Sequence, residues 1–410
     1  MVSTAFTLGS RLIGTIIRKM GNIGTVQNKF ISQILILFLS MRGRHNFLSF
    51  GRYGHMDEHS YRYHFKKNFD WIEFNRQYVA ENCSDEVIIG FDPSYITKSG
   101  KFTHGIGYFY SGCSGKYERG LEIGNFSVID VKQNTAYHLL ATQSKYVKRE
   151  KSTDDTLMDQ YVELLKLTCK TILSISGVLV VDAYFCKNKY ITACKDLGIE
   201  CITRLRDDAN LRYKYNGPTK TGKGRRKLYG EKVYFDRLDK RKFNLVHNNS
   251  EMKIYTCIAN SISLKCDIRV AYVEFLDAKG NIKLTKKFMS TNLDRDGLSI
   301  VQYYRARYQM EFVFRDAKQY TGLEHCQARD EEKLNYHFNA SLTSVNIAKG
   351  IARKGVKKDE EINISISDIK IELSNRLLLD LFISNYGIDP NLQKNRKIYN
   401  ELLNFGKNAA

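Results

Sequence analysis

Residues 303–322 read YYRARYQMEFVFRDAKQYTG, a stretch in which cationic, aromatic and acidic side chains recur at helical spacing. At about 100° per residue, four of them fall within about 60° of one another on a helical wheel. The four are Tyr304, Arg307, Glu311 and Lys318. The other side of the helix would carry an apolar stripe wide enough to pack on a core. The stripe consists of Tyr303, Ala306, Met310, Val313, Phe314 and Ala317. The stretch therefore predicts a helix that packs on one side and displays charged groups on the other.

A charged helix face by itself has a simpler interpretation, which is a solvated surface with ion pairs at three- and four-residue spacing. The composition of the whole chain helps to decide between a solvated face and a functional one. The formal net charge of its 410 residues is +20, and the pI is near 9.4. Such an excess of cations is typical of proteins that bind a polyanion, and we expect nucleic acid rather than a membrane surface.

The chain carries the features of a folded, soluble protein of two or three domains, with 43% hydrophobic residues. Its longest apolar run, ISQILILFLSM at residues 31–41, is well short of the roughly 20 residues that span a bilayer and predicts a core helix. No amphipathic anchor for a membrane is evident. The nine cysteines show neither CxxC pairs nor zinc spacing, which is typical of reduced thiols in a cytoplasmic protein.

Residues 5–80 predict several helices. Within them, MDEHSYRYHFKKNF at residues 56–69 carries Arg62 and Lys66 among aromatic residues, a composition that suits contact with DNA phosphates or insertion into a groove. The alternative interpretation is a surface helix of a small bundle.

A region of strands begins near residue 86. We expect three strands, then a helix, a strand, a second helix and a fifth strand. Their predicted positions are 87–92, 106–110, 121–131, 153–175, 176–185, 186–197 and 200–205. The run at 87–92 ends in Asp92-Pro93, and the run VLVV within 176–185 ends in Asp182.

Residues 206–292 interrupt this alternation. The segment 204–227 holds nine Lys or Arg against two Asp, so we expect an exposed loop that orders on a phosphate backbone, with Arg225, Arg226 and Lys227 at its end. Three strands should follow, at 252–259, 264–276 and 282–292. Helices are expected to resume at about 296, to continue through 353 and to include a helical tail to 410.

Asp92 and Asp182 each close an apolar strand run, where rigid elements often present functional side chains. Either one alone is more commonly a turn former. Together with Glu311 they make three carboxylates on three elements, which are the hard oxygen ligands that two divalent cations roughly 4 Å apart would need. Such a site activates water and stabilises the leaving oxygen of a phosphodiester.

The spacing Tyr304-x2-Arg307-x3-Glu311-x6-Lys318 resembles the YREK signature of bacterial insertion-sequence transposases with a DDE catalytic triad. The resemblance implies an α/β fold: a ribonuclease H-like mixed-sheet core interrupted by a β-rich insertion, with helical N- and C-terminal regions. The implied regions are a DNA-binding part (1–82), a first core part (83–205), the insertion (206–292), a second core part with the Glu helix (293–353) and a C-terminal part (354–410).

The resemblance also implies a chemistry. Asp92, Asp182 and Glu311 would hold two Mg²⁺ ions, or Mn²⁺ in their place, for cut-and-paste transposition. Water would cleave at the transposon end, and the freed 3′ hydroxyl would attack the opposite strand or the target DNA. Tyr304, Arg307 and Lys318 would contact phosphates near the cut, and Arg315 is a further candidate contact. Relatives that form a DNA hairpin use a tryptophan in or after the insertion, whereas the one tryptophan here is Trp71; another aromatic would have to serve, or the hairpin step would differ.

The implied partners are double-stranded DNA, as terminal inverted repeats and as target, and a second copy of the chain in the active complex. The implied location is the bacterial cytoplasm, at the nucleoid. Two alternatives stay open. One is a catalytically silent DNA-binding descendant, which would have no need of three carboxylates that repel phosphate. The other is a ribonuclease H-like nuclease without strand transfer, which the signature and the long insertion disfavour.

Overall fold

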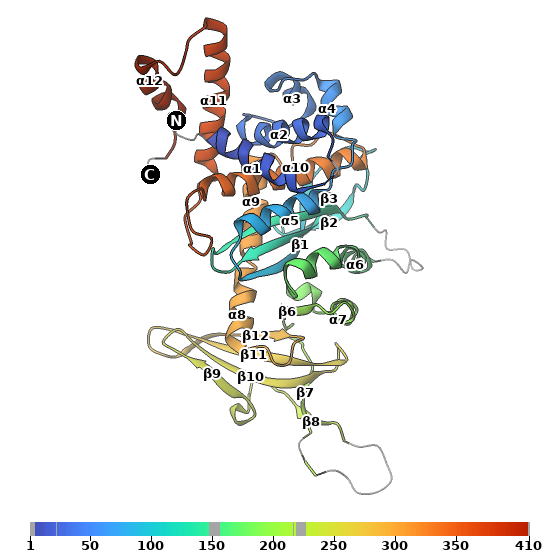
Figure 1. Cartoon of the computed structure of the whole chain (residues 1–410). Helices are drawn as coiled ribbons and strands as arrows, with labels where there is room; N and C mark the ends of the chain where they lie inside the picture. The colour runs from blue at the N-terminus through green and yellow to red at the C-terminus, as the bar shows by residue number, and fades with distance from the viewer. Residues whose placement is uncertain (1–4, 22, 147–155, 216, 219–226, 409–410) are drawn as a thin grey trace. The chain divides into compact units, whose positions relative to one another are not determined.

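The computed structural model describes residues 5–21, 23–146, 156–215, 217–218 and 227–408. In chain order, helical segments come before and after the strands of a large mixed sheet (Figure 1). The chain forms two compact units, each assembled from separate segments. The first unit consists of Met1–Val87, Pro93–Lys151 and Gln309–Ala410, and the second of Ile88–Asp92 and Ser152–Tyr308.

Most of the elements in the first unit are helices. They are α1 (Ala5–Lys19), α2 (Thr25–Ser40), α3 (Phe47–Tyr53), α4 (Glu58–His64), α5 (Trp71–Asn82), α9 (Gln309–Tyr320), α10 (Glu331–Ala352), α11 (Ile366–Tyr386) and α12 (Gln393–Asn404). The predicted apolar helix at 31–41 is confirmed as part of α2, which packs along α10 in the core (Figure 1). The predicted helix at 56–69 shrinks to the seven residues of α4, because Asp57 caps its start and the helix ends at His64.

The strands of the first unit are β2 (Gly107–Ser111), β3 (Lys116–Asp130) and β4 (Thr135–Gln143). Strand β3 pairs antiparallel with β2 through its first residues and with β4 through its later ones. The prediction of three strands before the first helix of this region was wrong, because β4 is a further strand. Its burial explains the omission: β4 is buried at nearly every position and therefore lacks the alternation that marks a half-exposed strand.

Two asparagines of α10 hydrogen-bond the backbone of β4. Asn346 accepts from the His138 N–H at 2.9 Å and donates to the His138 carbonyl at 2.8 Å. Asn339, two helical turns earlier, does the same at Ala141, with both distances 2.9 Å. Since buried peptide groups need partners, these side chains supply the bonds that another strand would otherwise make. This explains why a buried helix carries so many polar residues.

Strand β1 (Val87–Thr97) contributes to both units. We expected the strand to end at Asp92-Pro93, and this expectation was wrong, because the strand continues through Pro93 to Thr97. A proline removes only one backbone donor, and the residue before it favours extended geometry, so a strand can pass through the position. What does change there is burial: residues 88–91 are buried, whereas 92–95 are partly exposed.

The second unit holds a parallel group of strands, in which β5 (Val178–Val181) lies between β1 and β6 (Glu200–Arg204). The predicted helices are confirmed as α6 (Leu157–Ile175) and α7 (Asn188–Asp196), and a short helix η1 (Ala183–Phe185) follows β5. Thr156 and Asp159 form a reciprocal capping box at the start of α6. The first residues of the predicted 153–175 helix lie outside the described residues.

The region 206–292 is rich in strands, as predicted. Its elements are β7 (Leu211–Lys214), β8 (Tyr229–Lys232), η2 (Lys240–Lys242), β9 (Asn244–Asn248), β10 (Met252–Ser261), β11 (Cys266–Leu276) and β12 (Ile282–Ser290). The three predicted strands correspond to β10, β11 and β12. Strand β12 pairs antiparallel with β6, with Ser290 opposite Ile202, so the strands of this region extend the same sheet in the order β6-β12-β11-β10-β7-β8.

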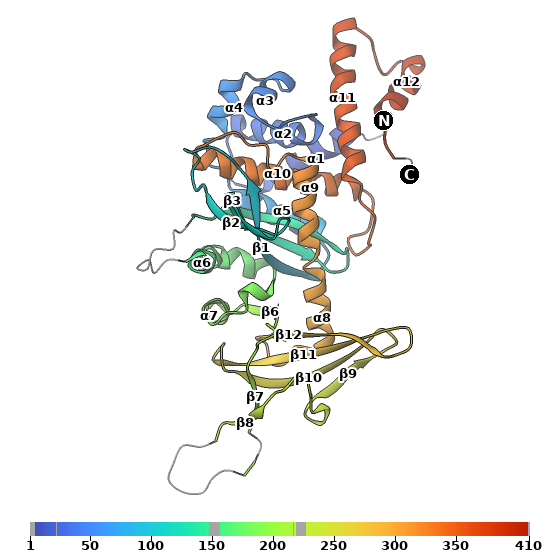
Figure 2. The same cartoon turned by 180° about the vertical axis from the view of Figure 1, so that it is seen from behind.

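The stretch at 303–322 forms two helices instead of one. Helix α8 (Gly297–Ala306) ends at Arg307, where the Tyr308 N–H bonds the Arg305 carbonyl in a tightened turn, and α9 starts at Gln309. The expectation of one continuous helical face was therefore wrong. Helix α8 packs on the sheet formed by β10, β11 and β12 (Figure 2). Within the described part of the chain, no helix is long and apolar enough to cross a membrane.

Candidate functional site

The strand register brings two of the predicted carboxylates to neighbouring positions. In the parallel pair of β1 and β5, Phe91 lies opposite Val181. The next residues are Asp92 and Asp182, and the backbone of Asp182 is still extended. Adjacent strands lie about 4.8 Å apart, and side chains at the same register point to the same face. The second unit therefore carries an acidic pair at the point where burial of the strands ends.

Two residues from the end of α8 contact this acidic pair. The Tyr304 hydroxyl donates to Asp182 Oδ1 at 3.3 Å, and Arg307 Nη1 lies 3.8 Å from Asp92 Oδ1. The contact between Arg307 and Asp92 is largely shielded from solvent, with side-chain exposures of 14% and 22%, and Tyr304 and Asp182 are partly buried. The sequence predicted phosphate contacts for Tyr304 and Arg307; the structure places both beside the carboxylates.

The positions of these groups are fixed by their surroundings. The Thr203 hydroxyl, on the neighbouring strand β6, donates to the backbone carbonyl of Asp182 at 3.0 Å. The ring of Tyr304 packs on Phe288 with centroids 4.7 Å apart. Burial, together with the charge of Asp182, raises the pKa of Tyr304 to about 12. The phenol therefore stays protonated and remains a hydrogen-bond donor to the carboxylate at any physiological pH.

Glu311 and Lys318 belong to α9, in the first unit. Helix α9 buries its part of the predicted apolar stripe, with Met310, Val313 and Ala317 fully enclosed, and leaves Glu311 exposed. The other two members, Tyr303 and Ala306, belong to α8 and are partly buried. Lys318 Nζ donates to the Tyr95 carbonyl in the second half of β1 at 2.9 Å and lies 3.2 Å from Glu324 Oε1. The outward side of the helix thus carries charge, as the pattern predicted.

The acidic pair has the donor chemistry of a site for a hard divalent cation. Asp92 and Asp182 are partly exposed residues, and carboxylate oxygens are ligands that Mg²⁺ prefers. Over the described ranges, no three His, Cys, Asp or Glu side chains are gathered closely enough to form a metal site. The pair thus fits two of the three predicted ligands, and Glu311, the third, lies in the other unit.

The remaining predicted DNA contacts have varied surroundings. Arg315 donates from Nη2 and Nε to the buried Asp316 at 2.8 and 3.1 Å. Arg62 pairs with Glu58 one turn earlier, and Lys66 is exposed after the end of α4. Lys227 lies over the Tyr215 ring at 4.9 Å. Arg225 and Arg226 lie outside the described residues.

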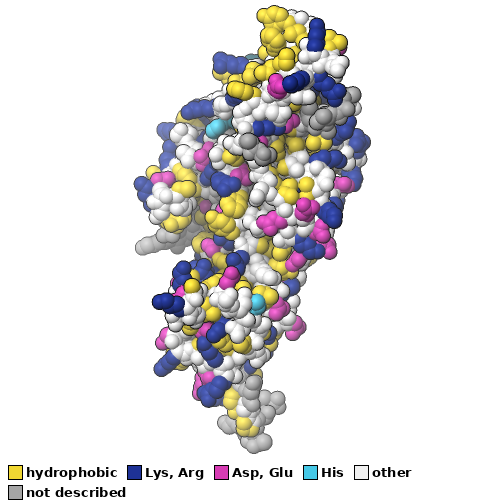
Figure 3. Space-filling model, turned by 90° about the vertical axis from the view of Figure 1, so that its left-hand side faces the viewer, with side chains coloured by type: hydrophobic (Ala, Val, Ile, Leu, Met, Phe, Trp, Pro, Cys, Tyr) yellow, Lys and Arg dark blue, Asp and Glu magenta, His cyan; other side chains and the backbone are white. Residues whose placement is uncertain are grey.

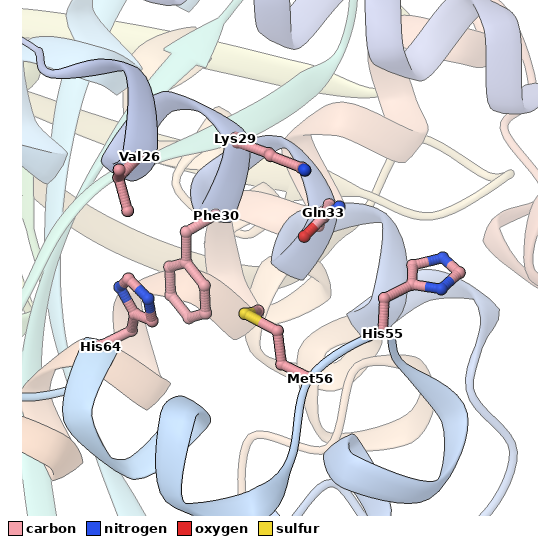
Figure 4. Close-up of a pocket in the computed structure, with 7 residues that line it drawn as sticks. All are labelled: Val26, Lys29, Phe30, Gln33, His55, Met56 and His64. Atoms are coloured by element: carbon pink, nitrogen blue, oxygen red, sulfur yellow. The ribbon is translucent and has the colours of Figure 1, made fainter.

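A cavity of about 310 Å³ lies among the N-terminal helices (Figure 4). Its lining residues are Val26, Lys29, Phe30, Gln33, His55, Met56 and His64. The imidazole of His64 stacks on the ring of Phe30 with centroids 4.2 Å apart. His64 thus serves the packing of α4 on α2, whereas Lys66 and Lys67 face solvent. The one tryptophan, Trp71, is buried against Phe69 and Tyr336, so it belongs to the core.

Sequence reasoning missed an ion pair that ties α8 to the sheet. Arg295, just before α8, donates from Nε and Nη2 to both carboxylate oxygens of Glu200 at the start of β6, at 2.9 and 2.5 Å. The Ser290 hydroxyl also donates to Glu200. The exposure of the Glu200 side chain is only 9%. The two partners are 95 residues apart, so no local spacing in the sequence indicates the pair.

Comparison with known proteins gives one family. The sequence profile of the Transposase DDE domain family matches residues 126–347, a range that includes Asp182 and Glu311 and begins after Asp92. Among solved structures, a cryo-EM structure of a piggyBac transposase synaptic complex with hairpin DNA resembles the chain with a TM-score of 0.38 and 15% identity, over 99% of this chain and 77% of that one. The search of curated proteins found no match.

Proposed function

The chain belongs to the Transposase DDE domain family, and from this premise we propose that it is a cut-and-paste DNA transposase of the bacterial insertion-sequence type that carries the YREK signature. The observation that carries the proposal is the parallel register of β1 and β5, which sets Asp92 beside Asp182. The strand sequence β4-β3-β1-β5-β6 supports a ribonuclease H-like core. Glu311 would complete the triad.

In this proposal the three carboxylates would hold Mg²⁺, which would supply an activated water and stabilise charge on the leaving oxygen. Tyr304 orients one ligand, because its hydroxyl donates a hydrogen bond to Oδ1 of Asp182. The other carboxylate oxygen of Asp182 would then bind the metal ion. Because burial and the charge of Asp182 raise the pKa of Tyr304 to about 12, the proton stays on the phenol throughout. Tyr304 thus holds a carboxylate in position without titrating.

Arg307 provides the cation for the substrate in this proposal. At 3.8 Å its contact with Asp92 is a loose ion pair, and a guanidinium fork binds phosphate oxygens well. When the scissile phosphate arrives, Arg307 would hold it next to the acidic pair. Lys318 would contact the backbone further along the DNA. This arrangement accounts for cations around catalytic acids, since the substrate is itself a polyanion.

The partners in this proposal are the terminal inverted repeats of the element, the target DNA and a second copy of the chain. The N-terminal region, with Arg62 and Lys66, and the basic segment that ends with Arg225, Arg226 and Lys227 would bind duplex phosphates, in the nucleoid of a bacterial cell. The excess charge of +20 supports such binding.

The experiment is cleavage of a duplex oligonucleotide that carries the terminal inverted repeat, in Mg²⁺, followed by joining to a plasmid. Asp182→Asn and Glu311→Gln should each lower the cleavage rate by on the order of 1,000-fold. Glu332→Gln is the matched control, because Glu332 is an exposed glutamate at the start of α10. Cleavage by Glu311→Gln at the normal rate would refute the proposal. Cleavage without joining would instead indicate a nuclease, and binding without cleavage a silent descendant.

A further inference from the structure

The hairpin formed by β2 and the first residues of β3 displays tyrosines on one face. In its antiparallel register Tyr108 lies opposite Arg119, and Tyr110 lies opposite Tyr117. Residues directly opposite each other share a face of the sheet, and so do residues two apart on one strand. All four side chains therefore lie on the same side of the hairpin, which we call the tyrosine face.

The tyrosine face is open to solvent. Tyr108, Tyr110 and Tyr117 are 55%, 54% and 62% exposed. Phe109 and Ser111, which alternate with the exposed residues of β2, are buried on the other side. The rings of Tyr110 and Tyr117 meet edge to face, with centroids 5.7 Å apart. The hairpin is thus anchored without the three tyrosines, whose ring surfaces are left to contact a ligand.

Two further tyrosines hold the base of the hairpin, where Gly107 lies opposite Gly120. A Cβ at Gly107 would come within 2.1 Å of Tyr146. A Cβ at Gly120 would come within 2.5 Å of Tyr95, so both rings pack directly on the hairpin backbone. The Tyr95 hydroxyl also donates to the Arg119 carbonyl at 2.8 Å. The tyrosine face is therefore fixed in position before a ligand binds, which lowers the entropy cost of binding.

The area of the tyrosine face matches a small number of nucleic-acid bases. Because an aromatic side chain buries about 150–250 Å², three rings that are half exposed offer on the order of 300 Å². Each partner of a standard protein–protein interface buries about 800 Å². The face is thus too small for a stable protein partner, whereas two or three stacked bases would cover it.

The charge around the tyrosine face is complementary to a phosphate backbone. From 93 to 120 the chain holds four cationic residues against one acidic residue, namely Lys98, Lys101, Lys116 and Arg119 against Glu118. Lys and Arg are also spread over the side of the molecule drawn in Figure 3, so positive charge alone does not single out the hairpin. The rings do, because surfaces that bind single strands combine cations for the phosphates with aromatic side chains on which the bases stack.

A single strand fits this face better than a duplex. In a duplex the bases are stacked on each other, so protein contacts go to phosphates and to base edges in the grooves. Tyr108 and Tyr110 are two residues apart on one strand, a separation of about 7 Å. An extended single strand can therefore place one base on each ring.

We propose that the tyrosine face binds single-stranded DNA, with bases stacked on Tyr108, Tyr110 and Tyr117 and a phosphate at Arg119. The inference deepens the proposed function, and it rests on that function for the choice of DNA over RNA. Stacking and phosphate contacts need no metal ion. Binding can therefore be measured apart from cleavage, and a chain that failed to cleave DNA would still bind the single strand.

The test is the Kd of the full chain for a fluorescent oligo(dT) of about ten nucleotides, measured by anisotropy in EDTA at a salt concentration that weakens purely electrostatic binding. Tyr110→Ala/Tyr117→Ala should raise this Kd by roughly 30-fold or more, because two stacking rings are lost. Tyr110→Phe/Tyr117→Phe keeps both rings and should stay within about 2-fold of wild type. An unchanged Kd of the alanine variant would overturn the proposal.

A duplex of the same length separates stacking from phosphate binding. The alanine variant should bind the duplex within about 2-fold of the wild-type Kd, since paired bases are not free to stack on the rings. An equal loss of affinity for the duplex and for the single strand would show that the face is a duplex contact and would contradict the proposal.

A second measurement does not depend on a variant that folds. An oligo(dT) that contains bromodeoxyuridine should cross-link to the wild-type chain under ultraviolet light, and mass spectrometry should place adducts on Tyr108, Tyr110 or Tyr117. Unlabelled oligo(dT) in excess should remove these adducts. Adducts confined to other peptides would refute the assignment, and stronger competition by oligouridylate than by oligo(dT) would refute the choice of DNA.

Discussion

Two arginines of one short stretch, Arg307 and Arg315, have different surroundings. Arg307 faces Asp92 at the acidic pair. Arg315 is about 59% exposed, yet both its donating nitrogens are directed to the buried Asp316, and its guanidinium lies 4.4 Å from the Phe312 ring centroid. A helical wheel places both on the same side. Under the proposed function Arg307 would bind the substrate, whereas the contacts of Arg315 stabilise α9.

Substitution by methionine separates these two roles. Arg307→Met should lower the rate of cleavage of a transposon-end oligonucleotide by about 100-fold, because a group that stabilises substrate charge is lost. Arg315→Met should leave that rate within a few fold and lower the free energy of unfolding by about 1 kcal/mol, since Asp316 loses its donors. Cleavage assays and urea unfolding measure the two effects. Equal loss of cleavage in both variants would contradict this division.

Among the elements, α8 depends on a contact far away in the sequence. The ion pair of Arg295 with Glu200 joins the residues that lead into α8 to the start of β6. Helix α8 in turn carries Tyr304, and Arg307 follows at its end. We infer that the pair sets the position of both residues relative to Asp182 and Asp92.

Arg295→Met should lower the free energy of unfolding by about 2–3 kcal/mol, because it leaves the nearly buried Glu200 without its cation. Urea unfolding measures the change. Arg241→Met is the matched control: Arg241 pairs with Asp239 in a similar geometry, but its side chain is 91% exposed, so we expect no measurable change. A similar effect of the two substitutions would show that the ion pair is not what holds α8.

The elements also show what sequence could predict. The strands β1, β5, β6, β10, β11 and β12 and the helices α2, α6 and α7 follow from apolar periodicity, which is a local property. Strand β4 was missed because its second face is covered by α10, a contact that no local pattern encodes. The break between α8 and α9 was also missed, because neither Arg307 nor Tyr308 is a residue type that usually ends a helix.

The candidate site was also predicted only in part. Asp92 and Asp182 were chosen because each ends an apolar run, and the parallel register then sets them side by side. The contacts that Tyr304 and Arg307 make with these carboxylates were not predicted, and the predicted phosphate contacts of the two residues stay a prediction. The sequence indicates which charges occur, whereas the tertiary packing decides which charges meet.

At the scale of the molecule, three buried imidazoles make stability depend on pH. Burial lowers the pKa of His45 and His138 to about 3 and that of His337 to about 4. All three belong to the first unit. As the pH falls below 6.5, histidines of the unfolded chain bind protons, whereas these three stay neutral in the fold. The unfolded state then binds more protons, so acid destabilises the fold.

Each such imidazole should remove about 2 kcal/mol of stability between pH 6.5 and pH 5, since one pKa unit corresponds to about 1.4 kcal/mol. His337→Gln should flatten the pH dependence, because glutamine does not titrate and its amide can replace the donor that bonds the Gly322 carbonyl at 2.8 Å. Urea unfolding at several pH values measures the slope. His59→Gln, at an exposed position, should leave the slope unchanged; the prediction fails if the slope of His337→Gln matches that of wild type.

The pairing of β12 with β6 has a practical consequence for anyone who wishes to trim this protein. Because Ser290 and its neighbours pair with the backbone of Ile202 and Thr203, β12 covers an edge of β6 that would otherwise be open. A shortened chain that lacks residues 206–292 would leave the backbone N–H and C=O groups of β6 unpaired. We expect such an exposed edge strand to promote aggregation through pairing with strands of other molecules. A shortened version will therefore need another strand or segment that pairs with the exposed edge of β6, before any change to the acidic residues is considered.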